Sequence, residues 1–390
     1  MEVLLVLAVA AAAFVGFNVG GSSTGVAWGP SVGAGVTKKT TAAALMTVFA
    51  LLGGWTVGRN VVETLGSGVV APSAFTVEAS IVVLVFIGLG MVVANAYGVP
   101  VSTSMTAVGA IAGLGLATGT LDWAVLGEIV VWWLVAPVAG FWCGGVVGRY
   151  LYVHLQRVVE VEQSDGPMVT LDWSSFIPRP ALGPGTSLRE FVSTALVVVV
   201  ACYMSFSAGA SNVANAVAPL VGGGLLAPGP AVVLAAAAIG VGAFTIARRT
   251  MASVGSELTD LPLLAAMVVT VVAATITTAA SWLGIPISLA LSTVMTIVGL
   301  GWGRASRTAT AADLARGDVE GGVSVSAVAV EAGDGVAEIG EARADDLQDA
   351  AALFDPSTVA RFVSFWILGP SAATVLSYLA FFVLPVAGTP

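Results

Sequence analysis

The chain has 390 residues, of which 57% are hydrophobic and only 9% are charged, and its mean hydropathy is +0.98. Soluble proteins carry roughly 25% charged residues. The composition therefore excludes a soluble globular protein and indicates a multi-pass protein of the cell membrane, with the lipid bilayer as its partner and no nucleic acid.

The charge balance is acidic, with a formal net charge of −9 and lysine only at Lys38 and Lys39. This balance is typical of a halophilic archaeon, whose acidic surface stays hydrated in salt, and also of a GC-rich genome. Cys143 and Cys202 lie in apolar runs, where we expect buried thiols and no disulfide or metal site. With one histidine and no nucleotide-binding loop, we expect neither an enzyme nor a cofactor.

The first apolar span, Val3–Val19, begins with a run, Val3–Val15, that resembles a signal-peptide core. No basic residue precedes it and a glycine-rich stretch follows, so we predict a first membrane span. The following stretch, Gly20–Gly35, reads GGSSTGVAWGPSVGAG and is too rich in small and polar residues for a good continuous helix. Thr41–Val57 and Phe75–Tyr97 are predicted spans, and the amphipathic Gly58–Val70 between them is predicted to lie at the interface or to re-enter.

A small-residue turn, GVPVSTS at Gly98–Ser104, opens the next apolar segment, and Leu126–Tyr150 follows as another span. Residues 153–190 then break the pattern with several charges, four prolines and the only histidine of the chain. The arginines of this segment predict a soluble connector on the cytoplasmic side.

The second half of the chain repeats the landmarks of the first half in the same order. Gly209–Gly224 aligns without gaps on Gly20–Gly35 at an offset of 189, and Gly284–Ser288 repeats the start of the GVPVSTS turn at an offset of 186. Two further matches are Ala247–Ser256 on Gly58–Ser67, again at 189, and Trp366–Pro370 on Trp133–Pro137 at 233. Four landmarks in one order indicate an internal duplication.

The change of offset from 186 to 233 locates an insertion in the second half, whose length is the difference between the two offsets. Eleven of the 23 carboxylates fall between Asp313 and Asp355, which predicts a loosely folded acidic loop at about 303–360 without a transport role. The predicted organisation is a first transmembrane repeat at 1–150, a connector at 151–190 and a second repeat at 191–388.

Paired glycine- and proline-interrupted segments at matching places of two halves are the best sequence pointer to a transporter's substrate site. An oxyanion needs hydrogen-bond donors, which helix N-termini supply together with a favourable dipole. Neutral hydroxyl and amide side chains add donors without bringing a fixed charge into the bilayer. The predicted substrate-binding residues are Ser22, Ser23, Thr24, Ser102, Thr103, Ser104, Ser211, Asn212, Asn215 and Ser288. Close helix packing is the alternative explanation for such small residues.

These motifs resemble those of the inorganic phosphate transporter family, the phosphate permeases. Phe206–Ala216, FSAGASNVANA, is similar to the family signature Phe-Ser-His-Gly-Ala-Asn-Asp-Val-Ala-Asn-Ala, and the GVPVSTS turn is similar to Gly-Leu-Pro-Val-Ser-Thr-Thr-His. The resemblance implies an all-α polytopic membrane protein of two inverted-topology repeats with broken or re-entrant helices, about ten to twelve transmembrane helices in total. It also implies cation-coupled oxyanion uptake and a homodimer.

The chain departs from that pattern where the family carries a carboxylate in each broken segment. Ser22-Ser23 and Ser211-Asn212 stand there instead, and Ala208 replaces the signature histidine. The first motif is thereby closer to the sulfate permease branch of the family.

The substrate and the coupling ion stay open at this point. Hydrogen phosphate donates a hydrogen bond and favours an acceptor, whereas sulfate only accepts, so the lost carboxylates favour sulfate while family frequency favours phosphate. Coupling to Na+ or H+ fits, with a weak Na+ site near Asn212 and Asn215. An anion channel is the alternative from another class. Arg59, Arg248, Glu63 and Glu78 are interpreted as interfacial residues, although an intramembrane carboxylate is also a candidate proton carrier.

Overall fold

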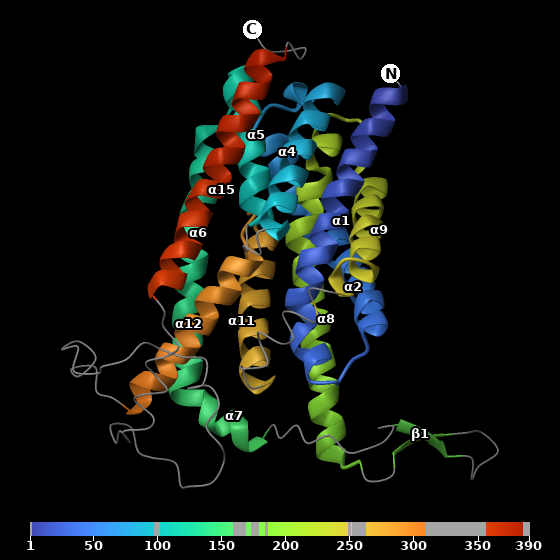
Figure 1. Ribbon diagram of the computed structural model, residues 1–390, viewed down its shortest axis with the longest axis vertical. Coiled ribbons are helices and arrows are strands. Elements are labelled where there is room, and N and C mark those ends of the chain that lie inside the picture. The colour runs from blue at the N-terminus through green and yellow to red at the C-terminus, as the bar shows by residue number, and fades with distance from the viewer. Residues whose placement is uncertain are drawn as a thin grey trace.

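The computed structural model describes residues 2–96, 102–158, 169–172, 179–183, 186–248, 251, 263–308 and 356–384. Nearly all of these described residues are helical. The exception is a short antiparallel pair, β1 (Val169–Asp172) and β2 (Arg179–Leu182), in which Val169 pairs with Leu182. The pair lies beside the lower end of the helical bundle (Figure 1), in the segment that we predict to be a soluble connector.

Ten helical elements build the first half and its exit into the connector. They are α1 (Glu2–Gly33), α2 (Lys39–Trp55), α3 (Gly58–Glu63), the π-helical η1 (Thr64–Gly68), the 3-10 turn η2 (Pro72–Ala74), α4 (Val77–Ala96), α5 (Thr103–Thr118), α6 (Trp123–Val146), the π-helical η3 (Val147–Leu151) and α7 (Tyr152–Val158). The described helices of the second half are α8 (Leu188–Gly222), α9 (Pro228–Phe244), α11 (Leu263–Trp282), α12 (Leu289–Thr308) and α15 (Pro356–Val383).

The helix boundaries repeat at the offsets that the motifs define. From α2 to α9 both the first and the last residue shift by 189, and from α4 to α11 both shift by 186. The start of α12 is offset from that of α5 by 186, and the start of α15 is offset from that of α6 by 233. The duplication therefore extends from short motifs to whole helices.

The two glycine-rich segments are helical, contrary to our prediction that they break the chain. Gly20–Gly33 is the C-terminal part of α1, and Gly209–Gly222 is the C-terminal part of α8, each continuous with the span before it. Low helix propensity is overridden here because tertiary packing, not propensity, provides most helical stability. Each helix ends three residues after its proline, and a glycine with positive φ follows, Gly35 at 72° and Gly224 at 66°.

The break in this fold lies instead between α2 and α3. The two segments Lys39–Trp55 and Gly58–Gly68 meet at 63°, with Thr56 as the C-cap of α2 at φ −92° and ψ −83°. This agrees with the predicted re-entrant or interfacial segment at Gly58–Val70.

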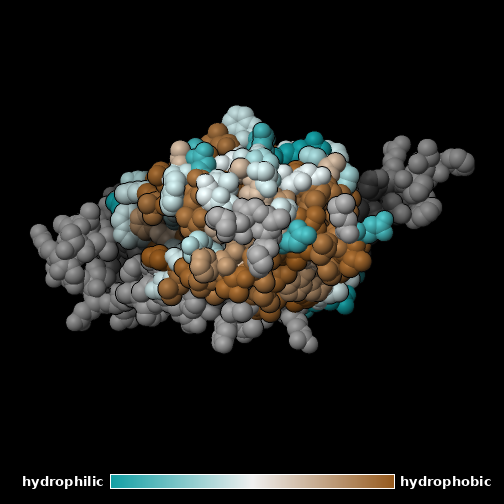
Figure 2. Space-filling view, turned by 90° about the horizontal axis from the view of Figure 1, so that it is seen from above, coloured by the Kyte–Doolittle hydropathy of each residue, from teal (hydrophilic) through white to brown (hydrophobic). Residues whose placement is uncertain are grey.

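Among the described residues, five helices are long and apolar enough to cross a membrane, and the bent pair makes six. They are α1, the helix that runs from Trp123 to Gln156, α8, α11 and the Trp366–Val383 part of α15; four shorter apolar helices accompany them, in α4, α5, α9 and α12. Seen from above, hydrophobic side chains cover much of the flank, and paler, more polar ones gather at the end that faces the viewer (Figure 2). The chain is a multi-pass membrane protein.

The two halves pack crosswise through glycines at equivalent positions. Gly20 of α1 lies against the backbone of Ile239 in α9, and Gly209 of α8 lies against the backbone of Ala50 in α2. The two glycines are related by the motif offset of 189, and so are their two partners. In Figure 1, α1 descends from the N-terminus while α8 ascends from the lower end. Small residues let these backbones approach closely, as in other membrane helix pairs.

Four predictions fall wholly or partly outside the described residues in more than one position. They concern the acidic loop, of which 309–355 are not described, the soluble connector, of which 159–168, 173–178 and 184–185 are not described, the first residues of the GVPVSTS turn at 98–101, and the residues 249–250 and 252–256 of the repeated Ala247–Ser256 stretch.

Candidate substrate site

Serines at equivalent positions cap two helices of the candidate site. Ser102 precedes α5, and its Oγ accepts a hydrogen bond from the Met105 N–H at 3.2 Å. Ser288 precedes α12, and its Oγ accepts from the Leu291 N–H at 3.1 Å. A capping serine satisfies one free N–H of the first helical turn. The turn positions that the sequence singles out thus open helices, while their own hydroxyls are used in capping.

The middle of α8 carries the polar residues of the second glycine-rich segment. Ser211 is fully buried, and Asn215 and Asn212 are 1% and 6% exposed. The Ser211 Oγ donates to the carbonyl oxygen of Ile287 at 3.0 Å and lies 3.3 Å from the Ser104 Oγ of α5. Ser104 and Ser211 come from different halves, so the structure brings two predicted segments together.

The Asn215 amide extends this contact into a network. Its Nδ2 donates to the Ser104 Oγ at 3.1 Å and to the Asn212 Oδ1 at 3.2 Å. Because a carbonyl oxygen only accepts, the Ser211 proton is committed to Ile287, and Ser104 must donate to Ser211. The protons of these groups therefore point in one direction, from Asn215 through Ser104 and Ser211 to Ile287.

One acceptor of the network is left over. The Oδ1 of Asn215 is buried and makes no hydrogen bond within the part of the chain that the structure describes. In the structure the Nδ2 of this amide faces two acceptors, which turns its Oδ1 away from them. Buried polar atoms are nearly always satisfied, so an orphaned acceptor calls for a ligand, a water or an ion. The Asn215 Oδ1 is therefore free either to accept a hydrogen bond or to bind a cation.

The first glycine-rich segment takes no part in this network. The hydroxyl of Ser22 donates to the carbonyl oxygens of Asn18 and Val19, and that of Thr24 donates to Gly20, all within α1. Ser23 is buried. Such bonds to the helix's own carbonyls are common for serine and threonine inside helices.

Helices α1 and α8 nevertheless contact each other close to the two glycine-rich segments. The Trp28 Nε1 of α1 donates to the Ser205 Oγ of α8 at 2.8 Å. Trp28 lies six residues after Ser22, and Ser205 lies six residues before Ser211. Since the two helices run in opposite directions (Figure 1), Ser22 and Ser211 lie at the same level of the bundle.

The position of the candidate site differs in one respect from the prediction. Ser211, Asn212 and Asn215 lie inside a continuous helix, so α8 offers no free N–H groups there. The helix N-termini near the cluster are those of α5 and α12, which Ser102 and Ser288 cap. Thr103, at the first residue of α5, is buried beside them.

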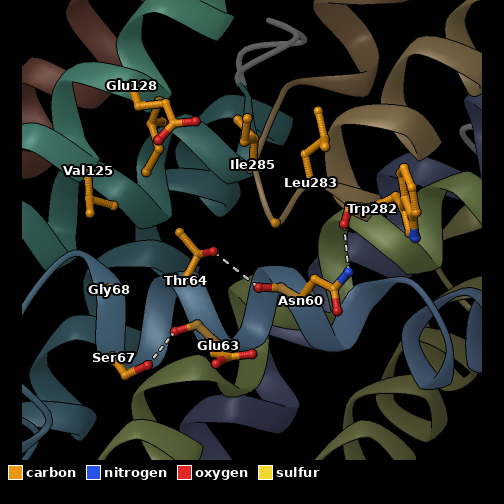
Figure 3. Close-up of a pocket in the computed structure, with 12 residues that line it drawn as sticks. Asn60, Glu63, Thr64, Ser67, Gly68, Val125, Glu128, Trp282, Leu283 and Ile285 are labelled. Carbon is orange, nitrogen blue, oxygen red and sulfur yellow. Dashed lines mark hydrogen bonds between the residues drawn. The ribbon is translucent and has the colours of Figure 1, made fainter.

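A separate open pocket of about 410 Å³ lies between the bent segment α3–η1, α6 and the turn after α11 (Figure 3). Two glutamates, Glu63 and Glu128, line it, and both are exposed. The Asn60 Nδ2 donates to the Trp282 carbonyl oxygen at 2.6 Å and ties the bent segment to the turn. Sequence reasoning missed Glu128; its only signal was a lone carboxylate in an apolar run.

The remaining charged residues that the sequence highlights lie outside the buried cluster. The Arg59 guanidinium lies 4.3 Å from the centre of the exposed Trp55 ring, and Glu78 is exposed in the first turn of α4. Arg248 contributes its carbonyl oxygen to a bond from the Lys39 Nζ at 3.2 Å. These positions agree with their interpretation as interfacial residues.

A duplicated bundle of apolar helices with a neutral, buried hydrogen-bond network at the contact of its halves defines a membrane transport protein. Residues 19–377 match the family model described as the phosphate transporter family. The chain belongs to this family, as its motifs predict.

Relatives from bacteria carry two different names. The sulfate permease CysP of Bacillus subtilis is 27% identical over 289 residues, which are 74% of each chain. A Haemophilus influenzae protein named "Putative phosphate permease" is 27% identical over 364 residues, covering 75% of this chain and 86% of the relative. A solved structure named "The sodium-dependent phosphate transporter" superposes with a TM-score of 0.66 at 18% identity, covering 98% of this chain and all of that one. This last similarity establishes the fold.

Proposed function

We propose that this protein is a secondary transporter that takes up an inorganic oxyanion across the cytoplasmic membrane, with phosphate as the first candidate substrate. The observation that carries the proposal is the buried network of Ser104, Ser211, Asn212 and Asn215 with its one unfilled acceptor. It joins the two halves of the chain at the contact where a rocking motion would expose it alternately to either side. The homodimer that the family resemblance implies remains a prediction.

We propose Na+ as the coupling ion, with H+ as the alternative. Sodium prefers oxygen ligands, and the Asn212 Oδ1 and the Ile287 carbonyl oxygen supply neutral ones next to Asn215 and Ser211. The name of the similar solved structure includes sodium dependence. No carboxylate takes part in the hydrogen bonds that the structure describes here, so we expect weak Na+ affinity.

The proposed mechanism is alternating access of two inverted repeats. Two features support it: equivalent glycines contact equivalent backbone of the opposite half, and α1 and α8 run in opposite directions. Contacts in which i meets j′ and j meets i′ are those of a two-fold relation.

Sulfate is the second candidate substrate. The absence of carboxylates at Ser22-Ser23 and Ser211-Asn212 and the similarity to a sulfate permease favour it. Sulfate only accepts hydrogen bonds, and a carboxylate facing it would repel it.

Uptake of labelled phosphate and labelled sulfate by proteoliposomes, with Na+ and H+ gradients varied independently, tests the proposal. We expect uptake of one or both anions that is driven by a cation gradient. Counterflow of labelled anion separates a carrier from an anion channel, because only alternating access produces it. Uptake that ignores both gradients and shows no counterflow would contradict the proposal.

A further inference from the structure

Helix α11 carries three buried hydroxyl groups without a hydrogen-bond partner among the described residues. They are the Oγ1 atoms of Thr277 and Thr278 and the Oγ of Ser281. The residues Thr277 and Ser281 have no exposed surface. A threonine inside a helix commonly bonds the carbonyl four residues earlier, as Thr275 of the same helix does with Val271 at 2.7 Å. The three hydroxyls therefore form an exception that needs an explanation.

These hydroxyls lie on the side of α11 that packs against α8. The Ser207 Oγ of α8 donates to the Ala274 carbonyl oxygen at 3.1 Å, and the Ser211 Oγ donates to Ile287 just after the helix. The three residues follow Ala274 by three, four and seven positions, so they share its face of the helix. The contacted residues Ala274 and Ile287 lie before and after the three hydroxyl-bearing residues in the chain. Their partners on α8, Ser207 and Ser211, are one helical turn apart.

The level along the bundle agrees with this placement. In Figure 1, α8 and α11 both rise from the lower end. Since Ser207 meets Ala274, the residue four positions later on each helix, Ser211 and Thr278, lies about 6 Å higher. The open hydroxyls of α11 thus lie beside the network of Ser211 and Asn215.

The two helices are complementary in hydrogen bonding. On α8 and α5 the hydroxyl protons of Ser104 and Ser211 are spent, and the open atom is the acceptor Asn215 Oδ1. On α11 the open groups are hydroxyls, whose protons are unspent. A ligand that fits both sides must accept several hydrogen bonds and donate at least one.

We propose that Thr277 and Ser281 donate hydrogen bonds to the transported oxyanion. The Asn215 Oδ1 accepts a hydrogen bond from the O–H group of that oxyanion. The site then selects a protonated oxyanion, hydrogen phosphate, over sulfate, which carries no proton near neutral pH. This inference rests on the proposed oxyanion transport and adds α11 to the site. An unpaired acceptor facing sulfate would cost binding free energy, which is the usual origin of strong discrimination between polar ligands.

The first half offers no equivalent hydroxyls. At the repeat offset of 186, Thr277 and Thr278 correspond to Met91 and Val92 in α4, and Ser281 corresponds to Asn95, which carries an amide and no hydroxyl.

The test uses hydroxyl-deleting variants on α11 in proteoliposomes. We expect Thr277→Val and Ser281→Ala each to raise the KM for phosphate about tenfold or more, the loss typical of a hydrogen bond to a charged group. Thr277→Ser keeps the hydroxyl and should stay within about twofold of the wild type. Thr275→Val is the matched control, because its exposed hydroxyl bonds its own helix and receives a bond from Tyr203. If Thr277→Val and Ser281→Ala behaved like Thr275→Val, the proposal would be overturned.

Selectivity tests the acceptor separately. We expect the wild type to prefer phosphate over sulfate, and Asn215→Leu to lower the ratio of phosphate to sulfate uptake about tenfold. Ser281→Ala should lower the uptake of both anions. Because this substitution removes only one oxygen atom, we expect the variant to fold. A wild type that prefers sulfate, or a ratio unchanged in folded Asn215→Leu, would refute the assignment. If the wild type carried neither anion, the proposed function itself would fail, whereas normal uptake with silent α11 variants would overturn only this inference.

Discussion

Gly20 and Gly209 occupy equivalent positions of the two halves, and each lies directly against the backbone of a helix in the opposite half. A Cβ at Gly20 would collide with the carbonyl of Ile239, and a Cβ at Gly209 would collide with that of Ala50. Ile239 and Ala50 are themselves equivalent, at the same offset of 189 as the glycines. Glycine is needed at both positions because a rigid backbone, not a flexible side chain, occupies the space.

Gly209→Ala should therefore force α8 away from α2 and disturb the substrate site two residues further on. We expect a loss of stability of about 1–3 kcal/mol, the usual cost of overpacking, and a loss of most uptake. Thermal unfolding in detergent and proteoliposome uptake measure the two effects. Gly127→Ala on α6 is the matched control, since no atom lies within 4 Å of its added Cβ. Equal behaviour of the two variants would show that the α8–α2 contact tolerates separation.

The fold could be predicted from the sequence where the signal was a repeat. Motif offsets of 189, 186 and 233 also relate the ends of whole helices. The prediction failed for the interior of the glycine-rich segments, which are helical in α1 and α8. Glycine and serine lower helix propensity, but a single sequence does not reveal that another helix packs onto those residues.

The candidate site could be predicted only in part, for a similar reason. The contacts of Ser104 with Ser211 and of Asn215 with Ser104 join residues that the motifs had selected. Ser22 and Thr24 were selected by the same argument, but their hydroxyls bond their own helix. Thr277 and Ser281 were missed, because nothing in an apolar span distinguishes a hydroxyl bonded to its own helix from an open one.

Labelling of engineered cysteines should distinguish the open pocket of Figure 3 from the buried network around Ser211. Cys143 is exposed, contrary to our expectation of a buried thiol, whereas Cys202 is buried. In a Cys143→Ser background, Ser67→Cys should therefore react rapidly with a membrane-impermeant thiol reagent. Ser67 is exposed and lines the pocket of Figure 3, whereas Ser211 has no exposed surface. Ser211→Cys should stay unlabelled until substrate and a cation gradient are added. Rapid labelling of Ser211→Cys without ligand would mean that the cluster is open at rest.

Replacement of residues 309–355 by a short Gly/Ser linker should leave uptake near the wild-type value. The first half joins the equivalent helices α5 and α6 through only the residues between Thr118 and Trp123. The end of α12 and the start of α15 are the lower ends of these two helices in Figure 1. Uptake per molecule inserted in the membrane is the measurement. A strong loss with normal insertion would assign the acidic loop a role in gating or regulation.

Asn212→Asp should strengthen sodium coupling and shift the substrate preference further toward phosphate. The Asn212 Oδ1 already accepts a hydrogen bond from Asn215, so a carboxylate can keep that bond. It adds a negative charge and a second acceptor at a position that is only 6% exposed. The charge favours Na+ among otherwise neutral oxygen ligands, and the acceptor suits the O–H of hydrogen phosphate while it repels sulfate. Parallel uptake of both anions at graded Na+ concentrations measures the two effects, with Ser67→Asp in the open pocket as a control for added charge. An unchanged ion requirement and an unchanged phosphate-to-sulfate ratio would show that residue 212 does not face the transported ions.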